Sequence, residues 1–503
     1  MIKRFAVTFA CVALVASFSP AHATTPTPYL VGAASKDISP IGFGTIHTGG
    51  YGLGDGTSPV SQAIGAGRNA AFGSDHIGAR AVVVDDGTNA VALVTVETQG
   101  MFPAYQNNPG DGLADIEDQV ASDIPRLAGH IVISNDHTHG GPDAIGAWGF
   151  IPSAYLDLIA SQTKKAIEAA YNARVPASIV AGSDDASDLM YNMTCTEALN
   201  QHRTDNYPNN VCTPLEDQKD GLLRAFQAKD ATGNVITTVV AYGAHATLGG
   251  GNGVHGDWPQ FLSDALTAAF PGSTGIAFEG TNGRTQPCRP ACSFTDPTTP
   301  GYNLSGSKAA YTTMLMHHVD KALADAPDVS GPVAAAKTFI RHEIENPGLF
   351  ALTQHGELIG APIQRSLQAP WTEGNTVRTI VSAVRIGDLL INGAPGEPYP
   401  NIAAGVVEAT NVTRQRHWTL ALADDQLGYL ISPVEAYPSI LAQAYVNDNS
   451  LFNVSPTIGD HVMCTQIRLA NAVGFTYTRL GGVDPRCNVW DAADTAEAAA
   501  GLI

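Results

Sequence analysis

Two histidines placed two residues apart carry the clearest chemical signal in the sequence. His137 and His139 follow the apolar, β-branched run Ile131–Ser134, which predicts a buried strand, and a polar turn begins at Gly140. If the backbone is still extended at this point, both imidazoles face one side and can bind a metal together. The alternative is a polar turn that happens to contain two histidines. The spacing alone does not decide between these two interpretations.

The residues around this pair form a recognisable pattern. Residues 136–142 read Asp-His-Thr-His-Gly-Gly-Pro, which resembles the Thr-His-Thr-His-Ser-Gly-Pro signature of the neutral (non-lysosomal) ceramidases. Residues 31–38 read Val-Gly-Ala-Ala-Ser-Lys-Asp-Ile, similar to that family's opening Val-Gly-x-Ala-x-x-Asp-Ile. The resemblance identifies the chain as a member of the neutral ceramidase superfamily. We expect it to cover nearly all of the mature chain but only the family's catalytic domain.

Three further motifs follow predicted strand ends. His245 lies in Gly-Ala-His-Ala-Thr (243–247), similar to the family's His-Pro-Thr-Ser, and Glu397 lies in Pro-Gly-Glu-Pro, similar to its metal-binding carboxylate motif. Tyr429 aligns best with the family's metal-coordinating tyrosine. Taken alone, a histidine after a strand is usually structural, and Tyr429 could instead pack on the rim of the core.

The resemblance implies a zinc site with the ligands His137, His245, Glu397 and Tyr429. It gives His139 a catalytic role, donating a hydrogen bond or moving a proton, and Tyr429 is a catalytic candidate as well. The sequence does not settle which of His137 and His139 binds the metal, and the family pattern favours His137. Hydrolytic zinc is typically bound by two imidazoles and a carboxylate, with a fourth position that is either open or occupied by tyrosine. Such a zinc ion lowers the pKa of bound water and polarises a carbonyl.

The implied activity is zinc-dependent hydrolysis of an amide bond in a small-molecule or lipid substrate such as an N-acyl lipid. A zinc esterase or lactonase is the enzymatic alternative, because the metal site does not distinguish acyl leaving groups. The second alternative is a non-catalytic binding protein of the same fold. Retention of His137, His245 and Glu397 argues against that second alternative.

One motif departs from the family. Its Gly-Asp-Val-Ser-Pro motif, which carries a proposed serine nucleophile, corresponds here to Gly-Arg-Thr-Gln-Pro, with Arg284 at the aspartate and Gln286 at the serine. Glutamine cannot act as a covalent nucleophile, so zinc-bound hydroxide would have to attack directly. Arg284 and Gln286 are candidate substrate-binding residues. Asp257 is the third candidate substrate-binding residue, and it is expected to cap the helix that starts there.

Composition excludes several classes of partner. The chain has 503 residues, is 44% hydrophobic and only 15% charged, and can therefore bury a large core. Its formal net charge of −20 argues against nucleic acid or an anionic membrane surface as an electrostatic partner.

The N-terminus predicts export. Lys3 and Arg4 precede an apolar run over 5–15, and Ala21-His22-Ala23 provides a small-x-small cleavage pattern. We therefore expect a signal peptide over 1–23 and a mature domain over 24–503 in a secreted or periplasmic protein. No other apolar run is long enough to span a bilayer, so no integral membrane segment is expected after signal removal.

Cysteine usage agrees with export. Six cysteines remain after signal removal, and sequence neighbours would pair as Cys195–Cys212, Cys288–Cys292 and Cys464–Cys487. Six cysteines allow many other connectivities, and a thiolate metal site on Cys288 and Cys292 is an alternative to one disulfide.

Local patterns predict an α/β protein: a single large domain with a layered, mixed β-sheet core flanked by helices. Strands are expected at 80–84 and 90–96 (a hairpin), 178–181, 235–242, 379–391 (a hairpin bent at Gly387) and 418–422, and helices at 114–124, 154–171 and 308–324. The glycine-rich stretch 42–67 is expected to be a long loop bordering the substrate cleft, and Asp37 to cap a turn. His317 and His318, adjacent on a predicted helix, are expected to be a solvated pair.

Overall fold

The protein is described from a computed structural model that covers residues 29–501, apart from 51, 193–218, 250–252, 288–293, 296–302, 305–307, 361–362, 369, 434–451 and 478–486. The predicted signal peptide lies outside the described residues, as do Cys195, Cys212, Cys288 and Cys292. None of the described helices combines the length and apolar character needed to cross a membrane.

The larger of two main sheets has eight strands in the order β11-β10-β9-β7-β1-β4-β5-β6. Its strands are β1 (Tyr29–Asp37), β4 (Gly78–Asp85), β5 (Ala90–Val96), β6 (Ile131–Asn135), β7 (Val175–Asp185), β9 (Leu222–Asp230), β10 (Val235–Tyr242) and β11 (Thr274–Glu279). Only the pairs β5–β6 and β10–β11 within this sheet are parallel. The predicted hairpin of β4 and β5 is confirmed, and β4, β5 and β6 are buried along their full length.

The smaller sheet follows the order β15-β17-β18-β20, and the short strand β16 also pairs with β17. These strands are β15 (Val333–Glu343), β16 (Thr372–Glu373), β17 (Thr376–Ile386), β18 (Leu389–Gly393) and β20 (His417–Leu420). The hairpin bent at Gly387 is confirmed, and Gly387 has the positive φ (60°) that such a turn requires. Strand β20 runs parallel to β18 and ends two residues before the predicted boundary.

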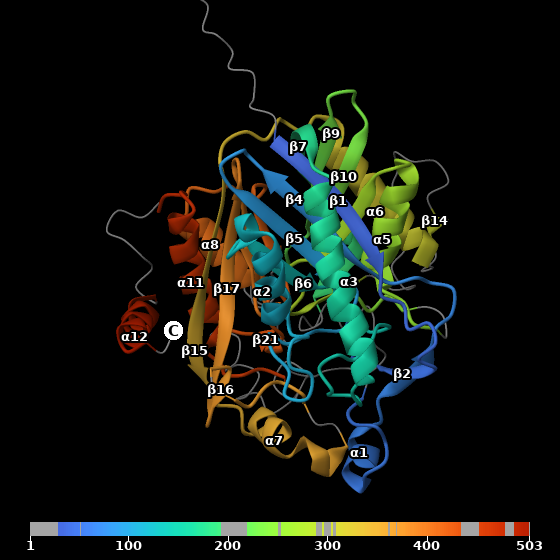
Figure 1. Ribbon diagram of the computed structural model, residues 1–503, viewed down its shortest axis with the longest axis vertical. Coiled ribbons are helices and arrows are strands. Elements are labelled where there is room, and N and C mark those ends of the chain that lie inside the picture. Colours follow the sequence, from blue (N-terminus) through green and yellow to red (C-terminus); the bar gives the residue numbers. More distant parts are fainter. Residues whose placement is uncertain are drawn as a thin grey trace, which may run out of the picture.

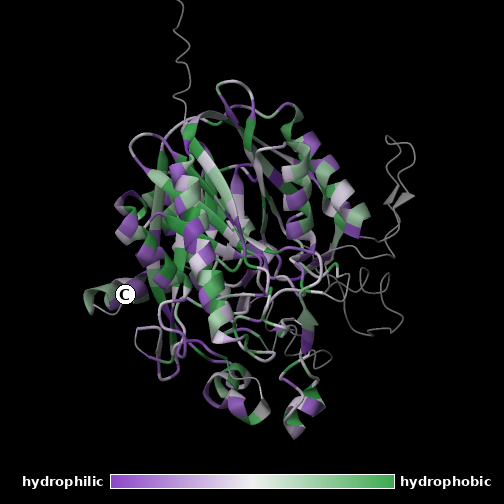
Figure 2. Cartoon of the chain, turned by 45° about the vertical axis from the view of Figure 1, so that its right-hand side comes forward, coloured by the Kyte–Doolittle hydropathy of each residue, from purple (hydrophilic) through white to green (hydrophobic). Residues whose placement is uncertain are grey.

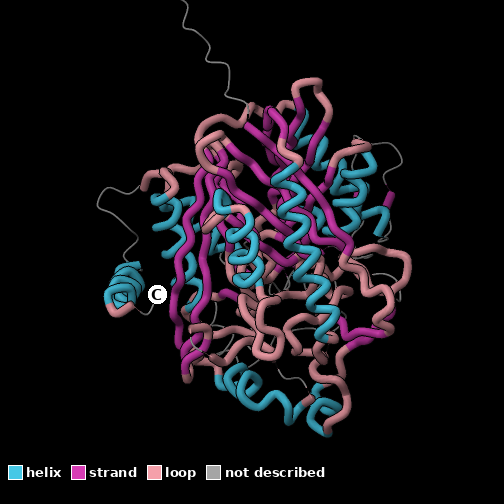
Figure 3. The backbone as a smooth tube through the Cα atoms, viewed as in Figure 1, coloured by secondary structure: helices cyan, strands magenta, loops and turns pink. Residues whose placement is uncertain are grey.

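The two sheets pack face to face, and helices cover their outer faces (Figures 1 and 3). One buried cluster joins Val82 and Leu93 of the larger sheet to Ile391 and Trp418 of the smaller one. Helices α2 (Leu113–Asp123), α3 (Ser153–Asn172), α5 (Asp257–Ala269) and α6 (Lys308–Ala324) cover the larger sheet, and α8 (Pro400–Ala409) and α11 (Ile458–Ala472) cover the smaller one. The strands are largely apolar and the outer helices carry the polar residues (Figure 2). The predicted layered α/β architecture is therefore confirmed.

The larger sheet is strongly curled. Strands β6 and β11 occupy its two opposite edges, yet they contact one another. Twist accumulates over eight strands and brings the two edges together. The ends of β6 and β10 therefore come close, although six strand-to-strand steps separate them in the order of the sheet.

Smaller elements complete the described chain. They are β2 (Thr45–Thr48), α1 (Pro59–Ile64), β3 (Arg68–Ala71), β8 (Met190–Asn192), β12 (Thr285–Pro287), β13 (Phe294–Thr295), β14 (Asn303–Leu304), α7 (Pro347–His355), β19 (Glu397–Pro398), β21 (Tyr429–Leu430) and α12 (Asn488–Ala499). The glycine-rich stretch 42–67 is thus not a loop throughout, because it contains β2 and α1.

Three local predictions can be compared with the structure. Asp37 accepts a hydrogen bond from the Ser39 N–H, as expected of a turn cap. The prediction that His317 and His318 form a solvated pair is wrong, because His318 is buried and its Nδ1 lies 2.6 Å from the Asp184 carboxylate. Asp257 begins α5 as predicted, but the N-cap position belongs to Gly256.

Candidate metal centre

His137 reaches the centre through an unusual backbone conformation. Two residues after β6 it has φ 53°, in the left-handed region, so the backbone is not extended there. Such a conformation costs on the order of 1 kcal/mol and is often found at functional sites. The two imidazoles nevertheless meet as predicted: Nε2 of His137 lies 3.4 Å from Nε2 of His139. The turn at His137, rather than strand alternation, places both rings on one side.

Backbone carbonyls fix how His137 and His245 are oriented. Nδ1 of His137 lies 3.0 Å from the Gln99 carbonyl, and Nδ1 of His245 lies 2.8 Å from the Asn282 carbonyl. A carbonyl only accepts, so each Nδ1 carries the hydrogen and donates it. Each Nε2 atom is then an unprotonated acceptor in the neutral ring, which is the state that binds a metal.

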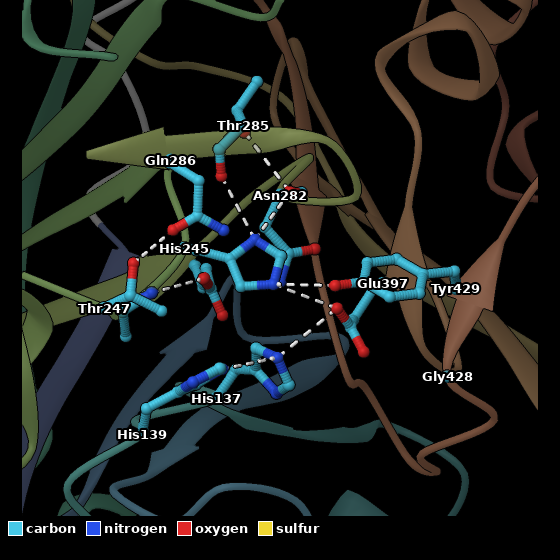
Figure 4. A network of polar contacts seen from close by, with 12 residues as sticks. His137, His139, His245, Thr247, Asn282, Thr285, Gln286, Glu397, Gly428 and Tyr429 are labelled. Atoms are coloured by element: carbon cyan, nitrogen blue, oxygen red, sulfur yellow. Dashed lines mark hydrogen bonds and ion pairs between the residues drawn. The ribbon is translucent and has the colours of Figure 1, made fainter. Parts of the chain in front are cut away.

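Glu397 and Tyr429 come to the centre as paired residues of two short parallel strands. Glu397 in β19 is the direct register partner of Tyr429 in β21. Oε2 of Glu397 lies 3.3 Å from Nε2 of His137 and 3.1 Å from Nε2 of His245, and the Tyr429 hydroxyl lies 3.4 Å from Nε2 of His245 (Figure 4). Residues from four separate segments thus converge on one point.

This convergence fits a cation. Two imidazole nitrogens that carry no hydrogen face a carboxylate oxygen that accepts no hydrogen bond, and all three residues are buried. Acceptors packed together away from water are costly unless a proton or a metal lies between them. Two imidazole nitrogens, one carboxylate oxygen and a phenol oxygen are donors that zinc accepts.

The charges of the site shift two pKa values in opposite directions. Burial lowers the pKa of His137, but the adjacent Glu397 carboxylate outweighs it and the net shift is upward. Burial raises the pKa of Glu397, and the charges and hydrogen bonds of His137 and His245, which act when these rings are protonated, outweigh it, so the net shift is strongly downward. A positive charge between these groups, from a metal or from ring protons, therefore holds Glu397 as the charged carboxylate.

His139 provides an alternative ligand. One ring nitrogen from each of His137, His139 and His245 lies within 4.8 Å of the other two. These three residues could therefore also hold a metal. His139 is less buried than the other two and lines an adjacent cavity. His137 and His245 are common to both ligand sets.

The three predicted substrate-binding residues lie around this centre without lining the adjacent cavity. Gln286 accepts a hydrogen bond from the Thr247 hydroxyl, close to His245 (Figure 4). The Arg284 guanidinium lies 4.4 Å from the centre of the Tyr399 ring. Asp257 is fully buried, and its carboxylate accepts hydrogen bonds from backbone N–H groups of three residues, among them Leu248 and Gly249 in the loop after His245.

The sequence reasoning missed three supporting residues. Gln99 and Asn282 supply the carbonyls that orient the imidazoles. Glu279, the last residue of β11, is fully buried and accepts a hydrogen bond from the Ala246 N–H. Burial and the charges of Asp136 and Glu397 raise the pKa of Glu279 well above its ordinary value. Glu279 could have been recognised in the sequence as a carboxylate at the end of an apolar strand. The Gln99 and Asn282 carbonyls could not, because every residue has a backbone carbonyl.

A mostly apolar cavity of about 450 Å³ adjoins the centre. His137, His139, Glu397 and Tyr429 form part of its wall. The apolar lining residues are Leu53, Ile64, Phe102, Ile145, Ala147, Trp148, Ile344, Leu349, Ile363, Leu367, Val377, Leu427, Phe452 and Val454. Leu53 and Ile64 belong to the glycine-rich stretch 42–67, so this stretch forms part of the cavity wall. Arg365 also lines the cavity and is paired with Asp425.

Together these features define an α/β protein with a candidate metal centre at converging strand ends and an apolar cavity beside it. The fold is that of the neutral ceramidases. It is similar to the crystal structure of neutral ceramidase from Pseudomonas aeruginosa (TM-score 0.64, 16% identity, 89% of this chain and 74% of that chain). It is equally similar to a structure described as ceramidase complexed with C2 (TM-score 0.64, 16% identity, 92% and 78%). A scan against protein-family models and a sequence search of the curated proteins gave no match.

Proposed function

We propose that this protein is an exported, zinc-dependent amidohydrolase that cleaves the amide bond of an N-acyl lipid. Zinc would be held by His137, His245, Glu397 and Tyr429. The observation that carries this proposal is the convergence of two unprotonated Nε2 atoms on one buried carboxylate oxygen, at 3.3 and 3.1 Å. The fold shared with neutral ceramidases supports the choice of an amide substrate.

A zinc ion held there would lower the pKa of a water molecule towards neutrality and polarise the amide carbonyl. The protein supplies the remaining parts. The Gln99 and Asn282 carbonyls keep Nε2 of each ligand imidazole free of a hydrogen. We assign His139, on the cavity side, to moving a proton between water and the leaving amine. We assign the Tyr429 hydroxyl to donating a hydrogen bond to the carbonyl oxygen as negative charge develops on it.

The substrate class follows from the cavity. Apart from the metal ligands and the internally paired Arg365, its wall is dominated by aliphatic and aromatic side chains. Such a wall stabilises a buried hydrocarbon chain by roughly 0.8 kcal/mol per methylene. Among the described lining residues, no unpaired charge outside the metal centre is offered to an ionic group. We therefore place the acyl or alkyl chain of the substrate in this cavity and the scissile amide at Glu397.

Gln286 and Arg284 have a different role in this proposal. Gln286 cannot form an acyl-enzyme, and its hydrogen bond with Thr247 supports the loop that carries His245. Arg284 packs on Tyr399, whose ring centre lies 6.4 Å from that of Tyr429. We assign both residues, together with Asp257, to supporting the ligand-bearing loops around the substrate.

The test is a matched panel assayed with the purified protein at known zinc content. It pairs N-acyl amides and oxygen esters that carry the same acyl chain. The proposal is supported if the amides are cleaved, if chelation abolishes this activity and if added zinc restores it. Cleavage of the esters alone would reassign the site to a zinc esterase or lactonase. Bound zinc with neither substrate cleaved would indicate a binding protein of the same fold.

A further inference from the structure

The C-terminal helix α12 carries two side chains into a buried aromatic and polar cluster on α11. It begins directly after Cys487, which forms a disulfide with Cys464 of α11, and it lies beside α11 at the side of the molecule (Figure 1). The Trp490 ring stacks on the His461 ring with centres 4.4 Å apart and planes 12° apart. Asp494 accepts a hydrogen bond from Nε2 of His461 at 2.9 Å.

The cluster continues into the smaller sheet. Nδ1 of His461 lies 3.0 Å from Nδ1 of His342, a buried residue near the end of β15. Since Nε2 of His461 donates to Asp494, its Nδ1 accepts a hydrogen from Nδ1 of His342 when both rings are neutral. Nε2 of His342 then accepts from the Thr457 hydroxyl, 3.3 Å away. Each ring thus has a defined tautomer, and the hydrogen bonds run in one direction from Thr457 to α12.

Thr457 belongs to a segment that forms part of the cavity wall. Its N–H donates to the Ser455 hydroxyl at 3.0 Å, and that hydroxyl donates to the Glu345 carboxylate. The Glu345 N–H in turn donates to the Val454 carbonyl at 3.0 Å. Val454 lines the cavity, and so does Ile344, the neighbour of Glu345.

The same segment holds the backbone of Tyr429. The Tyr429 N–H donates to the Phe452 carbonyl at 2.6 Å. Gly428 has φ 74°, and a Cβ atom there would collide with that carbonyl. The backbone of Phe452 is therefore in direct contact with that of Gly428 and Tyr429.

We propose that Trp490, His461 and His342 are positioning residues that couple the docking of α12 to the placement of Tyr429 and of the cavity wall. The connection runs through the segment 452–457. Loss of the cluster would release this segment, and Tyr429 would lose the backbone hydrogen bond that fixes it beside His245. The inference rests on the proposed function only for the consequence that catalysis weakens.

The test is hydrogen exchange followed by mass spectrometry on the full-length, disulfide-intact protein. Trp490→Ala removes the stacking partner, and Val489→Ala, at the 67% exposed neighbour, is the matched control. We expect peptides containing 452–457 and Tyr429 to exchange about fivefold to tenfold faster in Trp490→Ala, as expected for one lost hydrogen bond, and to be unchanged in Val489→Ala. Unchanged exchange in α3 would show that the remaining fold is intact. Release of α12 with wild-type protection at Tyr429 would overturn the coupling.

A second pair of variants separates hydrogen bonding from packing. In His342→Gln the amide oxygen takes the place of Nε2 and still accepts from the Thr457 hydroxyl, whereas His342→Leu fills the site without an acceptor. We expect wild-type protection at Tyr429 in His342→Gln and faster exchange in His342→Leu. Equal behaviour of the two variants would overturn the role given to the histidine pair. Exchange is measured without substrate, so this result is independent of whether the protein hydrolyses amides.

Discussion

Nε2 of His245 and Oε2 of Glu397 lie 3.1 Å apart, although the two residues follow strands of different sheets. Neither atom carries a hydrogen when the ring is neutral, because Nδ1 of His245 donates to the Asn282 carbonyl. The same oxygen lies 3.3 Å from Nε2 of His137. This arrangement is stable with a cation between the three atoms and costly without one.

We expect about one zinc ion per chain. Replacing His245 by Ala removes a donor common to both possible ligand sets and should lower bound zinc by more than about tenfold in a folded protein. His355→Ala, at a histidine that is largely exposed and does not belong to the cluster, is the control and should keep the metal. Elemental analysis after gel filtration measures this, and stoichiometric zinc in His245→Ala would contradict the assignment.

Catalysis should depend far more on Glu397 than on Gln286. Glu397→Gln removes the charge of a ligand and should lower kcat/KM by more than about 100-fold. Gln286→Ala removes the hydrogen bond with Thr247 but no ligand charge, and should cost less than about tenfold. Steady-state kinetics on one N-acyl substrate compares the two variants. A larger loss of kcat/KM in Gln286→Ala than in Glu397→Gln would mean that the chemistry had been assigned to the wrong group.

In the proposed mechanism no acyl-enzyme should accumulate, because Gln286 stands where the sequence resemblance places the proposed serine nucleophile of the ceramidases. Chelation should abolish activity, and serine-directed covalent reagents should leave it unchanged. Rapid-quench kinetics should show no burst of leaving group. A burst equal to the enzyme concentration would point to the Thr281 or Thr285 hydroxyl, the two threonines in residues 280–287.

Cavity size should control chain-length preference. Leu349 on α7 lines the cavity and is only half-buried at the edge of a core cluster, so Leu349→Trp can fill part of the cavity. We expect kcat/KM for long acyl chains to fall by roughly tenfold or more, with short chains and zinc content little changed. Phe350→Trp introduces the same ring at the next, more exposed position, outside the cavity lining, and serves as the control. Equal losses for long and short chains would argue against the cavity as the chain-binding site.

The disulfide Cys464–Cys487 should stabilise the C-terminal region. It closes a loop with a sequence separation of 23, for which chain entropy predicts about 3 kcal/mol. Replacing both cysteines by serine should lower the free energy of unfolding by about that amount in denaturant titrations. The even number of cysteines in the mature chain also predicts almost no free thiol under denaturing, non-reducing conditions, and several free thiols would contradict the expected export.

Acid should destabilise the fold through buried neutral histidines. Burial and the neighbouring His461 lower the pKa of His342 to about 3, with Asp494 opposing them. The folded state therefore binds fewer protons than the unfolded state between about pH 3 and pH 6.5, the ordinary pKa of histidine. The stability contributed by neutral His342 is complete above pH 6.5 and is lost as the pH falls from there towards 3. The loss should approach about 1.4 kcal/mol per pH unit.

Replacing His342 by Asn removes this proton uptake. The slope of unfolding free energy against pH, measured between about pH 4 and 6, should be smaller in His342→Asn than in the wild type. His417, whose pKa burial and Arg224 also lower to about 3, should account for part of the remaining slope. An unchanged slope in the variant would mean that His342 is already protonated in the folded protein.

The sequence by itself determined the local elements and the residue types of the site. The boundaries of β10 and α6 agree with the predicted ranges, and the hairpins β4–β5 and β17–β18 turn where the sequence predicts. Apolar periodicity, β-branched runs and turn residues act over a few positions, so they can be recognised without knowledge of the fold. The same is true of the histidines and the carboxylate that follow strands.

Only the tertiary structure decided how these residues meet. Curling of the larger sheet brings the end of β6 to the end of β10, and the left-handed backbone at His137 aims its ring at Glu397. His318, expected in solvent, is buried because the sheet supplies Asp184 as a partner. The His342–His461 pair left no recognisable spacing in the sequence, since its members come from a strand and a helix far apart along the chain. Such contacts depend on sheet twist, layer packing and carbonyl positions, which no short-range pattern of residue types encodes.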